Sequence, residues 1–152
     1  MKAPLNSNEE CYTCRILEVG MVRDHTDWKT ILFLMGLSLL VCHELDAMTH
    51  QEWLLLPTLN ALPGETARTV FVIVHIPLLT VVFWLVSHQS SGVRRRSQVA
   101  FDGFLAIHAI LHFLMSGHDQ YSFEAPLEGL LVYGAAVAGL SHLLVTYRSQ
   151  TA

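Results

Sequence analysis

Four apolar segments dominate the sequence, each close to the roughly 20 residues that an α-helix needs to cross the hydrocarbon core of a membrane. They cover residues 30–49, 66–86, 99–117 and 126–147. Charged residues make up only 14% of the chain, whereas soluble domains carry roughly a quarter. We therefore predict an all-α fold, a polytopic bundle of four transmembrane helices. Short connections make neighbouring helices antiparallel.

The chain divides into three parts by polarity. Residues 1–27 form a polar arm, residues 28–148 the transmembrane domain, and residues 149–152 a short tail. The arm contains Cys11 and Cys14, an isolated CxxC pair. One such pair supplies only half of a typical zinc site, so we interpret these residues as two unconnected thiols.

Basic residues predict the orientation of the helices, because cytosolic loops of membrane proteins are enriched in Lys and Arg. Arg94, Arg95 and Arg96 lie between the second and third segments. Arg148 follows the fourth segment, whereas Arg68 alone flanks the other side. We expect both termini and the triple-arginine loop in the cytosol, in a multi-pass protein of the cell inner (cytoplasmic) membrane. With a net charge of -4 and no other basic patch, nucleic acid is not an expected partner.

Ionisable side chains gather in the half of the bundle that this orientation makes the outer one. His43, Asp46 and His50 have the i, i+3, i+7 spacing of one helical stripe, and His108 and His112 are four residues apart. A charge within hydrocarbon costs roughly 2.5–3.5 kcal/mol even on the most lenient scale. These residues are therefore expected to face one another inside the bundle rather than the lipid.

This layer predicts a metal site of the kind that helical bundles build from facing side chains. The predicted ligands are His43, Asp46, His75, His108 and His112. Glu44 or Glu128 is the predicted general acid or base. Imidazole combined with carboxylate suits Zn, Fe or Mn. The alternative is a hydrogen-bond network that holds the helices together, although such bonds are worth only about 0.6 kcal/mol in a membrane.

Several other polar residues have more ordinary interpretations. Four residues near the outer end are either solvated or members of the site, namely His50, Glu52, His118 and Asp119. His25 is expected to be solvated, and His88 and His142 to be interfacial or packing residues. The fourth segment has a face of small residues that would let a partner helix approach closely. These residues are Gly134, Ala135, Ala138 and Gly139.

The stretch from Cys42 to Trp53 resembles a motif in a group of small, uncharacterised bacterial integral membrane proteins. Those proteins carry an HXXEE-type or His-Glu motif at the end of an early helix, followed by histidines in a later one. The matching residues are His43, Glu44, Asp46, Glu52, Trp53, His108 and His112. The paired glutamate is not reproduced, since Glu-Leu-Asp-Ala follows His43. The resemblance implies a membrane helical bundle with a metal or proton site and no established activity.

We interpret the chain as a metal-dependent membrane enzyme that acts on a lipid-like or isoprenoid-like substrate. The metal would generate hydroxide for hydrolysis or, if it is iron, activate oxygen. One alternative is electron transfer through a b-type haem held by two histidines such as His75 and His108. Another is proton or ion translocation, although the first three segments show no obvious polar path on the cytosolic side of His108. The last is a structural subunit that docks through the small-residue face of the fourth segment.

Overall fold

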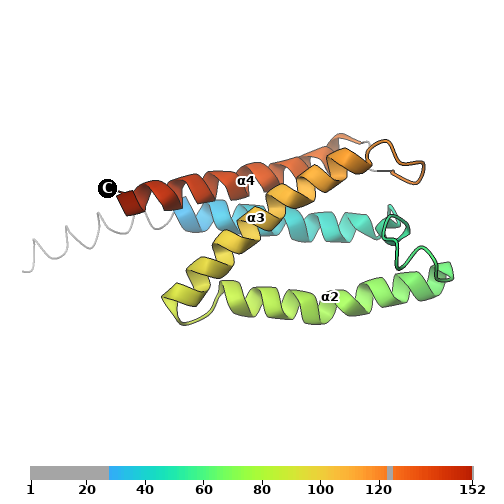
Figure 1. The fold of residues 1–152 in the computed structure, drawn as a ribbon, viewed down its shortest axis with the longest axis horizontal. Coiled ribbons are helices and arrows are strands. Elements are labelled where there is room, and N and C mark those ends of the chain that lie inside the picture. Colours follow the sequence, from blue (N-terminus) through green and yellow to red (C-terminus); the bar gives the residue numbers. More distant parts are fainter. Residues whose placement is uncertain (1–27, 123–124, 152) are drawn as a thin grey trace, which may run out of the picture.

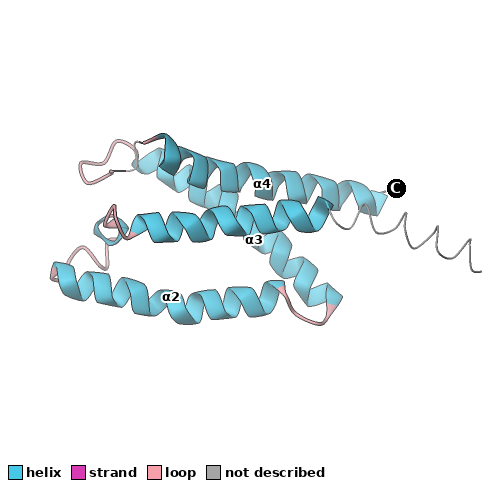
Figure 2. Ribbon diagram, turned by 180° about the vertical axis from the view of Figure 1, so that it is seen from behind, coloured by secondary structure: helices cyan, strands magenta, loops and turns pink. Residues whose placement is uncertain are grey.

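A computed structural model describes residues 28–122 and 125–151, and within these residues all of the regular secondary structure is helical (Figure 2). The long helices are Trp28–Ala47, α2 (Gly64–Val86), α3 (Ser91–Met115) and α4 (Pro126–Thr151), and a short 3-10 helix, η1, covers Glu52–Leu54. The four long helices are each long and apolar enough to cross a membrane. The predicted all-α four-helix membrane bundle is thus confirmed. The predicted polar arm, with Cys11, Cys14 and His25, lies outside the described residues, as does Ala152 of the tail.

The helices are not arranged symmetrically. α3 runs obliquely across the bundle, from the end of α2 to the side of α4, and helix Trp28–Ala47 lies alongside α4 (Figure 1). α3 packs more extensively against α4 than against α2. Only 11% of the most apolar stretch of α2 is buried inside the protein, compared with 39% for α4. α2 is therefore the peripheral helix, and most of its side chains are left for lipid.

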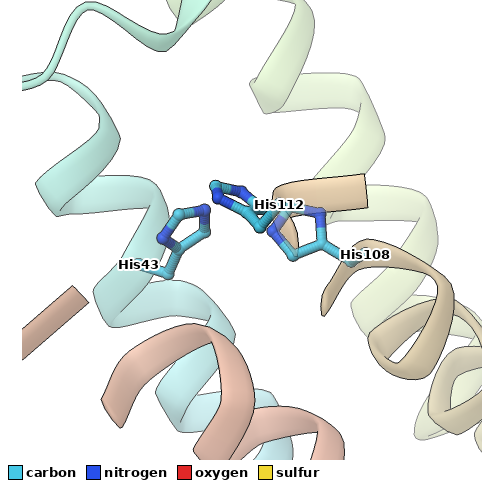
Figure 3. Close-up of side chains that lie close together, drawn as sticks. All are labelled: His43, His108 and His112. Atoms are coloured by element: carbon cyan, nitrogen blue, oxygen red, sulfur yellow. The ribbon is translucent and has the colours of Figure 1, made fainter. Parts of the chain in front are cut away.

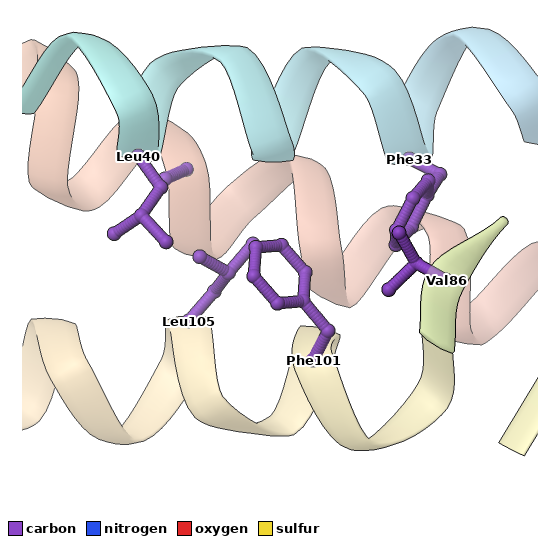
Figure 4. Packing of buried hydrophobic residues seen from close by; sticks show 6 residues of the cluster. Phe33, Leu40, Val86, Phe101 and Leu105 are labelled. Carbon is purple, nitrogen blue, oxygen red and sulfur yellow. The ribbon is translucent and has the colours of Figure 1, made fainter. Parts of the chain in front are cut away.

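Close contacts between small and large side chains hold the bundle together. Phe33, Leu40, Val86, Phe101 and Leu105 form the central apolar cluster (Figure 4). Lipid tails are as apolar as these side chains, so close van der Waals packing, rather than escape from water, favours their association.

The small residues of α4 allow part of this close packing. A Cβ atom at Gly139 would lie 3.1 Å from the Leu105 side chain, and one at Gly134 would lie 3.4 Å from the Leu39 side chain. Ala135 and Ala138 are buried. The face that the sequence predicts for a partner helix is therefore in contact with other helices of the same chain.

Of the helix boundaries that differ from the sequence prediction, two change where functional candidates lie. α3 begins at Ser91 rather than near residue 99, so Arg94, Arg95 and Arg96 lie in its first turns and not in a loop. Arginine is a good helix former whose long side chain reaches toward the membrane surface, so the helix continues beyond its apolar part. The first described helix ends at Ala47. His50 therefore does not continue the helical stripe of His43.

Candidate metal centre

Three histidines from two helices meet near one end of the bundle. His43 lies in the last turns of helix Trp28–Ala47, and His108 and His112 lie one turn apart on α3 (Figure 3). The ring centroids are 5.0 Å apart for His43 and His108, 4.8 Å for His43 and His112, and 4.7 Å for His108 and His112. One potential ligand atom from each residue lies within 4.8 Å of the other two. His43 and His112 are buried, and His108 is half-buried.

A turn in the chain brings Glu52 to this group. Gln51 adopts a left-handed backbone conformation, with φ at 53°, and the chain then enters η1. Trp53 anchors η1 because its buried ring packs with Ala67 and Phe71 of α2. The Glu52 carboxylate is thereby held 3.6 Å from Nε2 of His43 and 3.7 Å from Nε2 of His112.

The environment of Glu52 favours the ionised carboxylate. Burial alone would raise its pKa, but the neighbouring His112 and His43 outweigh this effect and hold the pKa below its ordinary value. The group therefore combines three imidazoles with one anionic oxygen donor. This donor set suits Zn, Fe or Mn.

Neighbouring side chains orient two of the rings. Nδ1 of His112 lies 3.3 Å from the Tyr121 hydroxyl, which directs Nε2 of His112 toward Glu52. The Phe104 ring packs beside His108, with a centroid separation of 5.5 Å. A hydrogen bond to the second ring nitrogen fixes both the tautomer and the orientation of a metal-binding imidazole, whereas ring packing constrains only its orientation.

A second group that could hold a metal ion lies nearby. Nε2 of His50 is 2.9 Å from Glu128 of α4 and 3.7 Å from Asp46. One ligand atom from each of these three residues lies within 4.8 Å of the others. Nδ1 of His50 also lies 3.2 Å from the Ser122 hydroxyl. The structure thus places Asp46, a predicted ligand, and Glu128, a predicted acid or base, together in this second group.

His75 belongs to neither group. Its Nε2 lies 3.0 Å from the Glu44 carboxylate, and its Nδ1 lies 2.6 Å from the carbonyl oxygen of Phe71. A carbonyl only accepts hydrogen bonds, so Nδ1–H of His75 is the donor to Phe71. The five ligands predicted from the sequence are therefore divided among three places. His75 and His108, the histidines named for haem ligation, also lie in different groups.

Residues 29–149 match the model of a family of unknown function, DUF6713. The chain belongs to this family. No curated protein and no solved structure matches the chain. The family description names no activity and says nothing of the His-Glu motif.

Sequence reasoning missed Asp102 on α3. Asp102 and His142 of α4 are buried, and Oδ2 of Asp102 lies 2.6 Å from Nδ1 of His142. The pair lies on the side of His108 toward the start of α3, where the sequence showed no obvious polar path through the first three segments. An aspartate within an apolar helix needs a partner, and His142, on the small-residue face of α4, was the signal that could have identified one.

The residues left open by the sequence are also resolved. Glu52 and His50 belong to the two groups of potential ligands. His118 and Asp119 are exposed, and Nδ1 of His118 accepts a hydrogen bond from the backbone N–H of Gln120. His88 is half-buried in the connection between α2 and α3, and its Nδ1 accepts a hydrogen bond from the backbone N–H of Ser90.

Proposed function

We propose that this protein is a membrane-embedded metalloenzyme acting on a lipid-like substrate. Its Zn, Fe or Mn ion is held by His43, His108 and His112, with Glu52 as the carboxylate ligand. The observation that carries the proposal is the convergence of three imidazoles from two helices, with ligand atoms within 4.8 Å of one another, beside one half-buried carboxylate.

The spacing of these groups fits a metal ion. Ligands of a tetrahedral zinc ion, each roughly 2.0–2.1 Å from the metal, lie about 3.3–3.4 Å from one another. Ligand atoms within 4.8 Å of one another therefore need to move inward by less than about 1 Å. Nε2 of His108 is buried and has no hydrogen-bond partner among the described residues, and a bound metal ion would satisfy it.

The substrate class follows from an apolar cavity beside the centre. This cavity of about 330 Å³ is lined by helix Trp28–Ala47, α2 and α3, and Glu44 and His75 are the ionisable side chains in its wall. Phe104 also lines the cavity, and its ring packs against His108. An apolar chain in this cavity would therefore be separated from the ligand His108 by the Phe104 ring alone.

The cavity and Glu44 have different roles in the proposed reaction. The cavity binds and orients the apolar chain and excludes water from it. Glu44, whose carboxylate lies 3.0 Å from Nε2 of His75, is the proposed general acid or base. A bound metal supplies Lewis-acid chemistry for hydrolysis or, if it is iron, oxygen chemistry. The predicted orientation places this chemistry in the outer half of the inner membrane.

The test is elemental analysis and an absorption spectrum of protein purified in mild detergent without chelator. We expect stoichiometric Zn, Fe or Mn without a Soret band, and loss of the metal in His108→Ala. His118→Ala is the matched control, because it removes an exposed imidazole a short distance along the chain. A Soret band would instead favour the haem hypothesis. Protein that contains neither metal nor haem, or a His108→Ala variant with full metal content, would overturn the proposal.

A further inference from the structure

A second, larger cavity lies at the opposite end of the bundle. It has a volume of about 670 Å³, and its basic lining residues Lys29, Arg94 and Arg95 come from two different helices. None of the residues that line it is acidic. Ser91 places the N-terminus of α3 at the cavity, where the helix dipole adds positive potential. Both cavities have volumes within the range of small-molecule sites, roughly 300–1,000 Å³.

The basic side chains are held in place by neutral groups rather than by acids. Nζ of Lys29 donates to the Ser149 hydroxyl at 2.6 Å, and Nη1 of Arg94 donates to the carbonyl oxygen of His88 at 3.0 Å. Within residues 28–122 and 125–151, Lys29, Arg94 and Arg95 form no ion pair with a carboxylate. Clustered cations that lack countercharges in a partly enclosed site attract an anion.

The basic cavity adjoins the apolar one. Leu37 and Val86 line both cavities, so the basic end leads into the apolar space between helix Trp28–Ala47, α2 and α3. That space in turn extends to Glu44, His75 and Phe104. Along α3, Arg94 and His108 are separated by about 21 Å, at roughly 1.5 Å per residue. The two cavities together have the shape and polarity of an amphiphile with an anionic head and a long apolar chain.

We infer that the substrate is a lipid with a phosphate headgroup, bound with its head among Lys29, Arg94 and Arg95 and its chain in the apolar cavity. This inference rests on the proposed function, which places the reaction at the end of the lipid chain nearest the metal centre. It adds that the reacting position lies far along the chain from the headgroup, on the order of 20 Å. The enzyme therefore distinguishes its substrate by the head and acts on the chain.

The test is binding of hexadecyl phosphate to the full-length protein in a neutral detergent, measured by native mass spectrometry. Hexadecanol supplies the chain without the charge, and inorganic phosphate supplies the head without the chain. We expect hexadecyl phosphate to bind at least about tenfold more tightly than either probe, since hydrogen bonds to charged groups are worth about 1.5–3 kcal/mol. Equal binding of hexadecanol, or equal binding of inorganic phosphate, would overturn the inference.

Neighbouring arginines offer a matched pair of variants. Both side chains are exposed, but Arg95 lines the cavity and Arg96 does not. Arg95→Gln should weaken hexadecyl phosphate binding about tenfold, and Arg96→Gln by no more than about twofold. Equal losses in the two variants would show attraction to surface charge alone and would overturn the inference.

A second pair tests the position of the chain. Ala100 lines the apolar cavity and Val99 does not. Ala100→Phe should fill the cavity and abolish binding of the chain, whereas Val99→Phe should not. Equal effects of the two substitutions would overturn the placement of the chain. Metal content is measured on every variant, so that lost lipid binding with intact metal is assigned to this inference and not to the metal centre.

Discussion

Two buried polar groups in this bundle differ in a way that helps to separate a site from a packing contact. Asp102 and His142 pair one acid with one base at 2.6 Å, a normal hydrogen-bond distance. His43, His108 and His112 place three bases around one point, and the nearest carboxylate atoms lie 3.6 and 3.7 Å from the rings. The first arrangement is a direct contact that holds α3 against α4. The second is a group that could hold a metal ion if its ligand atoms moved inward.

The largest expected effect concerns metal content. His43→Ala should remove essentially all bound metal, because it deletes one of the three imidazoles at the centre. Asp102→Asn should retain the full metal content, because its pair lies outside the proposed ligand set. Both are measured as moles of metal per mole of chain. If Asp102→Asn also lost its metal while remaining folded, the distinction between the two groups would be wrong.

The next effect is on stability, and here the Asp102 variant is the one expected to change. Asp102→Ala should lower the free energy of unfolding by about 3 kcal/mol, because breaking one side of a buried pair leaves His142 without its acceptor. Denaturant titration in detergent, with and without chelator, measures this loss. It should be the same under both conditions. A loss that appeared only with metal present would instead tie Asp102 to the metal centre.

Metal removal tests the comparison from the other side. Binding of an ion to the native state alone stabilises it, by about 2.7 kcal/mol when the free ion is at 100 times its dissociation constant. A chelator should therefore lower the thermal midpoint of the wild-type protein and of Asp102→Asn, but leave that of His108→Ala unchanged. An equal response in His108→Ala would place the stabilising ion elsewhere, for example among Asp46, His50 and Glu128.

A smaller effect is expected at the carboxylate. Glu52→Gln keeps the size of the side chain and removes its charge, so it should weaken metal binding toward the upper end of the roughly 10–100-fold range for groups that support a metal site. The pKa of Glu52 is lowered, so the wild-type group loses its charge only as the pH falls below the ordinary glutamate range. The ratio of the two affinities should therefore be constant between about pH 6 and pH 8. A ratio that changed over this range would contradict the ionised state assigned to Glu52.

The four helices could be predicted from the sequence, because the length of an apolar segment is a local property that does not depend on how the helices pack. Spacing on one helix also predicted that His108 and His112 share a face, and the structure brings His43 of the first described helix to that face. The sequence could not separate Asp46 and His75 from these residues. Asp46 lies with His50 and Glu128, and His75 lies with Glu44. These contacts depend on the oblique course of α3 and the peripheral position of α2, which are properties of the assembled bundle.

The turn after Ala47 shows the same limit more sharply. Continued helical periodicity predicts His50 on the stripe of His43. The helix instead ends, and Gln51 adopts a left-handed backbone conformation. Glycine and asparagine are the residues that usually adopt it, so a glutamine at this position does not predict the turn. That turn brings Glu52 to the histidines and His50 to Glu128. The turn and the short helix η1 therefore determine that Glu52 lies beside His43 and His112 and that Glu128 lies beside His50.

The smallest expected effect tests whether the ring orientation at the centre matters. Tyr121→Phe removes the hydroxyl that lies 3.3 Å from Nδ1 of His112, a long contact, so metal affinity should fall by only about tenfold. The metal content at saturating metal should remain stoichiometric. Tyr133→Phe, which removes a half-exposed hydroxyl of α4, is the control and should leave the affinity unchanged. If the two variants behaved alike, His112 would be oriented by packing alone. The centre would then depend on helix placement, as the Asp102–His142 pair does, and not on a supporting hydrogen bond.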